Sequence, residues 1–188
     1  MVEKRRADAR RNLDALLEAA KAVFATSGVD APAKEITDRA GVGVGTLYRH
    51  FPQRSDLVIA VLEREIDACA EAGGRLSADN PPEVALTEWI QRYTDLVATK
   101  AGLASALQSS DAAHEALRAH FYERMSPVLD SLIGAAKIRP DVSAADILHA
   151  VALLSHPVPG EEPGYGRHLV AVFVDGLKKE KDGLKRAG

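Results

Sequence analysis

Apolar residues recur at helical spacing through most of this chain. Near the start, Leu13, Leu16, Leu17, Ala20 and Phe24 follow one another at intervals of three and four and form one apolar stripe. The run 169–174 is apolar enough for a strand, but it obeys helical spacing as well. The pattern predicts an all-α protein of about nine helices, over residues 10–27, 32–40, 44–51, 55–72, 83–100, 103–109, 111–137, 144–155 and 166–179.

Turn and cap residues set the expected ends of these helices. Ser55 and Ser143 are typical N-cap residues, and each precedes an apolar periodic segment. Residues 73–82 (GGRLSADNPP) combine glycine and proline and predict a break in the helical structure. Pro127 is expected to break or kink the helix predicted over residues 111–137, because proline lacks the backbone N–H that a helix interior needs.

The most informative segment is 40–51, AGVGVGTLYRHF, which joins two short helices through a turn that contains glycine. Gly41 stands where a helix commonly ends in the left-handed conformation. Leu47 and Phe51 are four residues apart and are predicted to face the interior. Gly45 lacks a side chain that would hold the backbone away from a groove. The exposed side is then predicted to carry Val44, Thr46, Tyr48, Arg49 and His50.

Hydroxyl, guanidinium and imidazole groups on one exposed turn suit phosphate oxygens and base edges. The segment therefore predicts a helix-turn-helix whose second helix enters a DNA groove. An ordinary helical hairpin with a polar outer face is the alternative. We expect a helix-turn-helix DNA-binding domain over residues 1–54 and a helical ligand-binding and dimerisation domain over residues 55–188.

The charge is distributed unevenly along the chain. The protein has 24 Lys and Arg against 27 Asp and Glu, a net charge of −3, which is not the balance of a nonspecific nucleic-acid binder. Residues 1–60 nevertheless carry +2 and the remainder −5. The basic residues at the start suit contacts with phosphates, although a solvated tail has the same composition: Lys4, Arg5, Arg6, Arg10 and Arg11.

Composition also narrows the function classes. Cys69 is the single cysteine, so neither an intramolecular disulfide nor a cysteine-based zinc site is expected. The N-terminus lacks the apolar run of a signal peptide, and no apolar stretch approaches the length of a membrane span. We therefore expect a cytoplasmic protein with no membrane partner, no metal and no cofactor. No catalytic triad or metal-ligand cluster has a distinctive local sequence, so the chain is not expected to be an enzyme.

The segment 40–51 resembles the recognition segment of the TetR family of transcriptional regulators. The helix count extends this resemblance over the full length. Two body segments, 89–107 (WIQRYTDLVATKAGLASAL) and 169–178 (LVAVFVDGLK), resemble the SbtR-like group within that family. The resemblance implies a homodimer formed through the last two helices, with each recognition helix in a major groove of a palindromic operator.

The resemblance also implies roles for individual residues. Val44, Gly45 and Tyr48 occupy positions that approach bases, and Lys34 matches a position that reaches base or phosphate. Many members have a hydroxyl residue where this chain has Ala33 and Gly43, so few side chains remain to read bases directly. We expect Arg49 to supply the missing contact by reading guanine. Backbone contacts are implied for Thr46, Tyr48, His50 and Arg54.

A ligand pocket and a dimer interface in the body are implied as well. The candidate pocket residues are Trp89, Tyr93 and Phe121, with Arg92 and His114 as polar partners. Aromatic residues at helical spacing are more often plain core, and that interpretation stays open here. The predicted dimer seam, which a lone subunit would expose, comprises Leu148, Val151, Leu154, Leu169, Val172 and Phe173.

Together these observations predict a one-component transcriptional regulator, most simply a repressor. It is expected to bind a palindromic double-stranded DNA operator as a homodimer and to be released by an unknown small-molecule effector. Two alternatives belong to other classes: a small-molecule-binding helical protein without operator binding, and a small helical enzyme.

Overall fold

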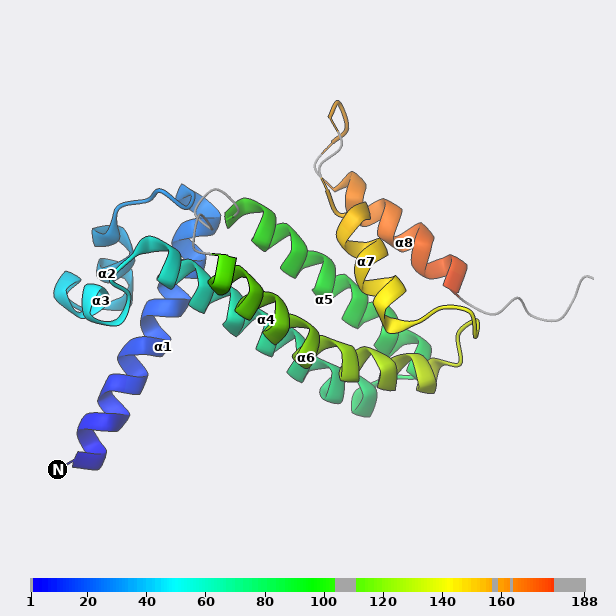
Figure 1. Cartoon of the computed structure of the whole chain (residues 1–188), viewed down its shortest axis with the longest axis horizontal. Coiled ribbons are helices and arrows are strands. Elements are labelled where there is room, and N and C mark those ends of the chain that lie inside the picture. Colours follow the sequence, from blue (N-terminus) through cyan, green and yellow to red (C-terminus); the bar gives the residue numbers. More distant parts are fainter. Residues whose placement is uncertain (1, 104–110, 157–158, 163, 178–188) are drawn as a thin grey trace, which may run out of the picture. The chain divides into compact units, whose positions relative to one another are not determined.

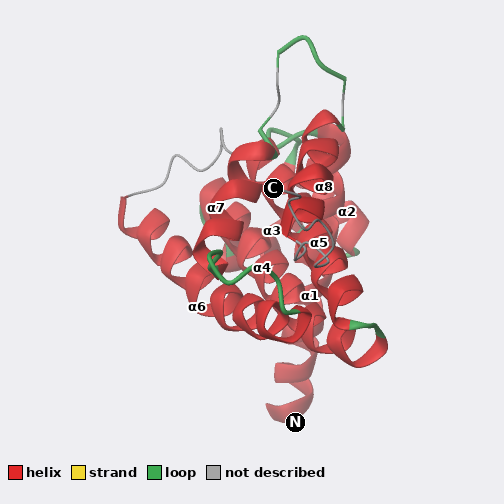
Figure 2. Ribbon diagram, turned by 90° about the vertical axis from the view of Figure 1, so that its right-hand side faces the viewer, coloured by secondary structure: helices red, strands yellow, loops and turns green. Residues whose placement is uncertain are grey.

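The computed structural model describes residues 2–103, 111–156, 159–162 and 164–177 of the 188-residue chain. These residues form eight helices and contain no strand, which confirms the predicted all-α class (Figures 1 and 2). The helices are α1 Val2–Ser27, α2 Ala33–Ala40, α3 Val44–His50, α4 Arg54–Asp79, α5 Pro82–Leu103, α6 Asp111–Ala136, α7 Ala144–Leu154 and α8 Tyr165–Leu177.

The chain divides into two compact units. The first comprises residues 1–67 and 99–121, and the second comprises residues 68–98 and 122–188. Helices α4, α5 and α6 therefore each contribute one part to each unit. The predicted domain boundary after residue 54 falls at the first residue of α4, and this division stays a prediction.

In the first unit, α1 packs against α2, and α2 packs against α3. The apolar stripe of α1 is buried as predicted, with Leu16 and Phe24 in the core. Three ion pairs join α1 to α4: Lys21 Nζ lies 2.8 Å from Glu65 Oε2, Arg64 Nη2 lies 3.0 Å from Glu18 Oε1, and Arg64 Nη1 lies 3.5 Å from Asp14 Oδ1. Such partly exposed pairs contribute little stability each, so the apolar stripe is what holds α1 in place.

In the second unit, buried aromatic side chains carry hydrogen bonds between helices. Trp89 of α5 donates its indole N–H to the carbonyl of Cys69 in α4, at 3.0 Å. Tyr93 donates its hydroxyl to the carbonyl of Leu148 in α7, at 2.9 Å. Because buried Trp and Tyr usually find partners for their polar atoms, these bonds orient α5 against both neighbours.

The largest difference between the predicted and the observed helices lies in α4. It runs through Gly73 and Gly74 to Asp79, so the break predicted over residues 73–82 is wrong for most of its length. Gly73 is buried, and a Cβ added there would lie far inside van der Waals distance of Val128 and 3.4 Å from the Trp89 indole nitrogen. Glycine at this position therefore serves close packing inside a helix rather than a turn.

Other helix ends differ in smaller ways. Helix α1 begins at Val2, before the predicted start at residue 10. Helix α6 continues across Pro127 without a break, and Met125 and Leu129 on either side of it are both buried. The short helix predicted at residues 103–109 lies outside the described residues, apart from Leu103 at the end of α5.

One of the two predicted N-caps is confirmed. The Ser143 side chain accepts a hydrogen bond from the Asp146 N–H, and the Asp146 carboxylate accepts one from the Ser143 N–H, which completes a capping box. Ser55 is instead inside the first turn of α4. There the Asp56 carboxylate accepts a hydrogen bond from the Gln53 N–H at 2.9 Å.

Two features are absent from the described part of the chain. None of its helices has the length and apolar character needed to cross a membrane. The same residues contain no group of three or more His, Cys, Asp or Glu side chains placed to hold a metal ion.

Candidate DNA-binding interface

The turn between α2 and α3 depends on one glycine. Gly41 follows α2 with φ 68° and ψ 30°, the left-handed conformation that glycine adopts without steric cost. Its N–H donates to the Asp38 carbonyl at 3.3 Å, and the Val42 N–H donates to the Thr37 carbonyl at 3.1 Å. Gly43 has an extended conformation, φ −76° and ψ 148°, which other residues also adopt. The predicted helix stop at Gly41 is therefore confirmed, and Gly43 is not required by backbone geometry.

Helix α3 has one buried and one exposed side, as the sequence predicted. Leu47 and, at its end, Phe51 are buried. Tyr48 is 53% exposed and Val44 is 39% exposed. Gly45 is exposed, and a Cβ built on it meets no atom within 4 Å, so the backbone is open to close approach from outside. Of the remaining predicted contacts of this helix, Thr46 is half-buried, and Arg49 and His50 are exposed.

Arg49 is held along the exposed side of α3. Its Nε–H donates to the Gly45 carbonyl at 3.0 Å, and its Nη2 lies 3.4 Å from the Thr46 hydroxyl oxygen. The guanidinium thus lies beside Gly45, where α3 has no side chain, and beside the Thr46 hydroxyl. This arrangement suits a planar group that hydrogen-bonds to a base edge.

Lys34, on α2, forms an ion pair with Asp38 one turn later, with Nζ to Oδ2 at 2.6 Å. Both side chains are exposed, and such a pair contributes little stability. Exchanging Asp38 for a phosphate oxygen would therefore cost little.

Arg54 differs from the other predicted contacts, because its guanidinium is engaged inside the unit. Its Nη2 donates to the carbonyl of Ala31, in the turn before α2. Its Cζ lies 5.7 Å from the centre of the Phe24 ring of α1, within the range of a cation–π contact. Its Nη1 is buried and has no hydrogen-bond partner among the described residues. The resemblance implies a phosphate contact for this group, and that role stays a prediction.

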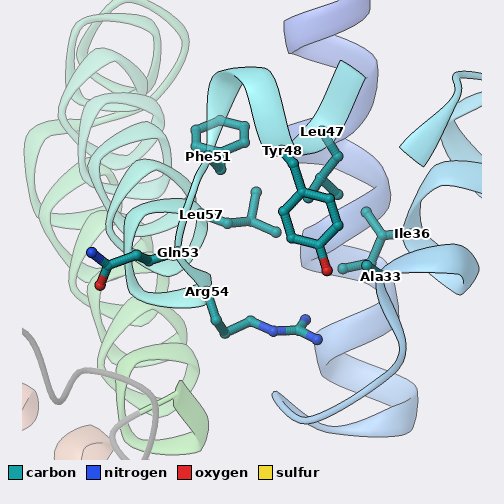
Figure 3. A pocket seen from close by; sticks show the side chains of 8 residues that line it. All are labelled: Ala33, Ile36, Leu47, Tyr48, Phe51, Gln53, Arg54 and Leu57. Atoms are coloured by element: carbon teal, nitrogen blue, oxygen red, sulfur yellow. The ribbon is translucent and has the colours of Figure 1, made fainter. Parts of the chain in front are cut away.

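A cavity of about 100 Å³ lies beneath α3 in the first unit (Figure 3). Tyr48 forms one side of it, and the Arg54 side chain extends from α4 along another, toward α1 and the turn that follows it. The other lining residues are Ala33, Ile36, Leu47, Phe51, Gln53 and Leu57. Tyr48 and Gln53 are exposed, so the cavity opens toward the surface.

The basic start of the chain is helical rather than an extended arm, because α1 begins at Val2. Arg11 forms an ion pair with Asp8, and both Arg10 and Arg11 are exposed. The side chains of Lys4, Arg5 and Arg6 lie outside the described part of the structure.

The predicted ligand residues differ in burial, and their role in a ligand site stays a prediction. Trp89 and Tyr93 are fully buried, and their rings stack with centroids 6.1 Å apart. Burial raises the pKa of the Tyr93 hydroxyl well above its ordinary value, which keeps it protonated as a hydrogen-bond donor. Arg92 and His114 are exposed, and Phe121 is half-buried. Trp89 and Tyr93 are core residues of α5, which was the alternative left open by the sequence.

The second unit does have a cavity of ligand size, about 330 Å³, between α5 and α8. An ion pair crosses it, with Arg167 Nη2 2.6 Å from Asp95 Oδ1. The sequence did not indicate this cavity, because its walls mix buried and exposed helix positions that carry no motif. Its lining residues are Thr87, Gln91, Thr94, Asp95, Arg167, Val170, Ala171, Val174 and Asp175.

The predicted dimer seam is partly corrected. Leu148 and Val151 are buried within the subunit, where α7 packs against α8, so the expectation that a lone subunit exposes them is wrong. Val172 is 57% exposed, as expected of a seam residue. Leu153, which the sequence prediction left out, is 72% exposed. Leu154, Leu169 and Phe173 are half-buried.

Comparison with known proteins identifies the family to which this chain and its helical hairpin belong. Residues 16–61 match the family model for the bacterial regulatory proteins of the tetR family, and residues 81–179 match the model for the C-terminal domain of SbtR-like transcriptional regulators. The chain belongs to the TetR family. The first match includes all of α2 and α3, so the hairpin is the helix-turn-helix of a TetR-family transcriptional regulator. The second confirms the predicted SbtR-like body.

Solved structures agree with this assignment. A TetR transcriptional regulator from Streptomyces coelicolor is 31% identical, with 89% of this chain and 99% of that chain covered and a TM-score of 0.73. A TetR regulatory protein from Mycobacterium vanbaalenii is 32% identical, with 92% and 98% covered and a TM-score of 0.70. An HTH-type transcriptional regulator of Staphylococcus aureus (strain USA300) is 40% identical over 63 residues. That match covers 33% of this regulator and only 34% of its relative.

Proposed function

We propose that this TetR-family regulator is a repressor that binds a near-palindromic operator as a homodimer and is released by a small-molecule effector. The observation that carries the proposal is the exposed side of α3. Leu47 and Phe51 anchor the helix, and the remaining positions leave a small, polar and aromatic surface open to a groove. A helix presented in this way enters the major groove in helix-turn-helix proteins.

Roles for the exposed residues follow from their chemistry. Gly45 and Val44 permit close approach to the base edges, and Tyr48 supplies an exposed ring and hydroxyl. Arg49 is the candidate for bidentate recognition of guanine. Contacts with the phosphate backbone are assigned to Lys34, Thr46 and His50. Such contacts position the protein on the duplex but do not read the base sequence.

Dimerisation is assigned to α7 and α8. Leu153 and Val172 are large apolar side chains that the subunit leaves exposed, and a second copy related by two-fold symmetry would bury them. Leu154, Leu169 and Phe173, which are half-buried, would complete the interface. The two helix-turn-helix domains of such a dimer would contact two half-sites that are separated by one turn of the DNA helix or a multiple of it.

Effector binding is assigned to the second unit. The cavity between α5 and α8 has a size typical of small-molecule sites, whereas Trp89 and Tyr93 fill the core and have their polar atoms paired. The effector must bind the DNA-incompetent dimer more tightly than the competent one, since only that difference releases DNA. A tryptophan at the exposed position Ala171 would fill the cavity. It should abolish effector-induced release while leaving DNA binding intact.

The test begins with selection of DNA. The wild-type protein is used to enrich duplexes from a randomised library, and the enriched sequence is footprinted. We expect a near-palindromic protected site bound by a dimer. Arg49→Ala should then cost about 1–3 kcal/mol on the selected duplex and relax the preference at one base pair. A protected half-site occupied by a monomer would refute the dimeric mode, and failure to enrich any sequence would refute operator binding.

A further inference from the structure

The exposed apolar side chains of α7 and α8 have histidines one helical turn away. Leu153 of α7 is 72% exposed, and His149 and His156 lie four residues before it and three residues after it. Val172 of α8 is 57% exposed, and His168 lies four residues before it. Residues three or four apart share one side of a helix, so these imidazoles border the surface that Leu153 and Val172 form.

The three imidazoles are exposed in the single subunit. His149 Nε2 lies 3.0 Å from the hydroxyl oxygen of Tyr122 in α6, and His156 Nδ1 lies 2.8 Å from the carbonyl oxygen of Ala152 in its own helix. The chain has six histidines, so half of them lie on the two helices to which dimerisation is assigned.

The exposed sides of α7 and α8 belong to one closely packed helix pair, which lies in the second unit (Figures 1 and 2). A Cβ added to Gly166 of α8 would lie 2.9 Å from the carbonyl oxygen of Leu154 and 3.3 Å from the Cα of Ser155, both at the end of α7. The end of α7 and the start of α8 therefore touch, which brings His156 and His168 to the same end of the pair.

His149 has a carboxylate close by. Asp146 precedes it by one turn of α7, and the two side chains interact electrostatically. Because Ser143 donates hydrogen bonds to this carboxylate, the pKa of Asp146 lies below its ordinary value. Asp146 is therefore ionised wherever an imidazole ordinarily titrates, and it partly neutralises a proton gained by His149.

The other two imidazoles have different surroundings. The described part of the loop that follows His156 carries the exposed carboxylates of Glu161 and Glu162. The ring of His168 lies 6.2 Å from that of Tyr165, centre to centre. Arg167, beside His168 in the chain, directs its guanidinium to Asp95 of α5.

An imidazole changes charge between about pH 5 and pH 8. A neutral imidazole tolerates burial beside apolar groups, whereas a buried cation without a partner is unfavourable. In a two-fold dimer each histidine occurs twice, so the interface formed by α7 and α8 would be bordered by two copies of each imidazole. Protonation therefore opposes association.

We propose that the surface of α7 and α8 is a pH-sensitive dimer interface, which closes when His149, His156 and His168 are neutral and opens when they are protonated. The inference rests on the proposed function, since it assigns regulation to the same homodimer. Binding to a near-palindromic operator needs both helix-turn-helix domains, so acidification releases DNA without an effector.

Linkage fixes the direction of the effect. Because burial disfavours the protonated imidazole, the dimer binds fewer protons than two separate subunits. Association is therefore strongest above the ordinary imidazole pKa of about 6.5 and weakens as the pH falls through it. His149 should contribute least, because the ionised Asp146 lies beside it.

The experiment measures the dimer dissociation constant of the full chain by sedimentation velocity without DNA, at constant ionic strength, at about pH 8 and about pH 5.5. A triple variant, His149→Gln with His156→Asn and His168→Gln, replaces the imidazoles with neutral amides. His120→Asn is the matched control: it removes a half-buried imidazole, 3.3 Å from Asp67, that lies outside α7 and α8. Circular dichroism at both pH values shows that each protein is folded.

We expect the wild-type dissociation constant to rise at least about tenfold from about pH 8 to about pH 5.5, which corresponds to about 1.4 kcal/mol. The constant of the triple variant should change by less than about threefold, and His120→Asn should keep the wild-type response. The ratio of the two constants is compared, so a variant that dimerises more weakly at both pH values still gives a result.

A wild-type dimer that is equally stable or more stable at the lower pH would overturn the inference and leave the proposed homodimer standing. A triple variant that keeps the wild-type response would overturn it as well, since the titrating groups would then lie elsewhere. A wild type that is monomeric at about pH 8 would instead refute the proposed dimer itself.

Operator binding gives a second readout. At about pH 5.5, and at a concentration where the wild type is monomeric, the triple variant should bind the selected duplex and the wild type should not. His50, which is assigned to the DNA backbone, is present in both proteins, so its charge does not affect the comparison. Equal binding by the two proteins would overturn the inference.

Discussion

Replacing Gly73 and Gly74 separately with alanine tests why α4 continues where the sequence predicts a break. Both glycines lie inside α4, so each replacement gains about 1 kcal/mol of helix propensity. Gly74 is exposed, and a Cβ there meets no atom within 4 Å. Gly74→Ala should therefore stabilise the protein by nearly that amount.

Gly73→Ala should behave differently, because its Cβ would overlap Val128 of α6 and touch the indole of Trp89 in α5. Overpacking of a core usually costs about 1–3 kcal/mol. Offset by the same propensity gain, the net effect is expected to lie between about zero and a destabilisation of 2 kcal/mol. The difference between the two variants, about 1–3 kcal/mol, isolates the cost of packing, since the propensity gain cancels.

Urea unfolding followed by circular dichroism, at one protein concentration for all variants, measures this difference. In a chain of this size, 1 kcal/mol corresponds to about 2–4 °C in Tm, so a thermal scan provides a second check. Adding Val128→Ala to Gly73→Ala should remove much of the clash, with a coupling between the two changes of at least about 0.5 kcal/mol. Equal stabilisation by Gly73→Ala and Gly74→Ala would show that α4 does not pack closely against Val128, and the reasoning would fail.

Four further predictions concern the second unit. Ser143→Ala should cost about 0.5–2 kcal/mol in urea unfolding, because it removes the side-chain acceptor of the α7 capping box. Hydrogen bonds from Ser143 lower the pKa of the Asp146 carboxyl in the folded protein. The ionised carboxylate therefore stabilises the fold at pH values above the ordinary carboxyl pKa. This stabilisation is lost as the pH falls through the lowered pKa of the folded state. An acid titration of wild type against Asp146→Asn should show this loss, and parallel curves would contradict it. Tyr93→Phe should destabilise by about 0.5–1.5 kcal/mol, since the Leu148 carbonyl loses its bond from the hydroxyl but remains within a helix; a neutral result would mean that the bond has no net value. Val172→Glu should give monomers in analytical ultracentrifugation and abolish operator binding, and a stable dimer would move the interface away from α8.

The sequence alone determined the features that rest on local chemistry. The helical class follows from spacing that each helix carries within itself, and the end of α2 follows from the freedom of Gly41 to adopt a positive φ. The inward side of α3 follows from the four-residue interval between Leu47 and Phe51. The cap at Ser143 involves only residues within three positions of one another. None of these depends on which distant segment lies nearby.

The tertiary structure decided everything that depends on a neighbour far along the chain. Gly73 resembles a helix breaker in sequence, but Trp89 and Val128 make it the residue that fits a close helix crossing. Trp89 and Tyr93 are core residues because Cys69 and Leu148 supply carbonyl partners for their polar atoms. The Arg54 guanidinium contacts Ala31 and Phe24, and its position in the sequence does not indicate either contact. The intrinsic helix propensity of a residue contributes little free energy, and a single buried contact can contribute more. The packing around such residues therefore sets their roles.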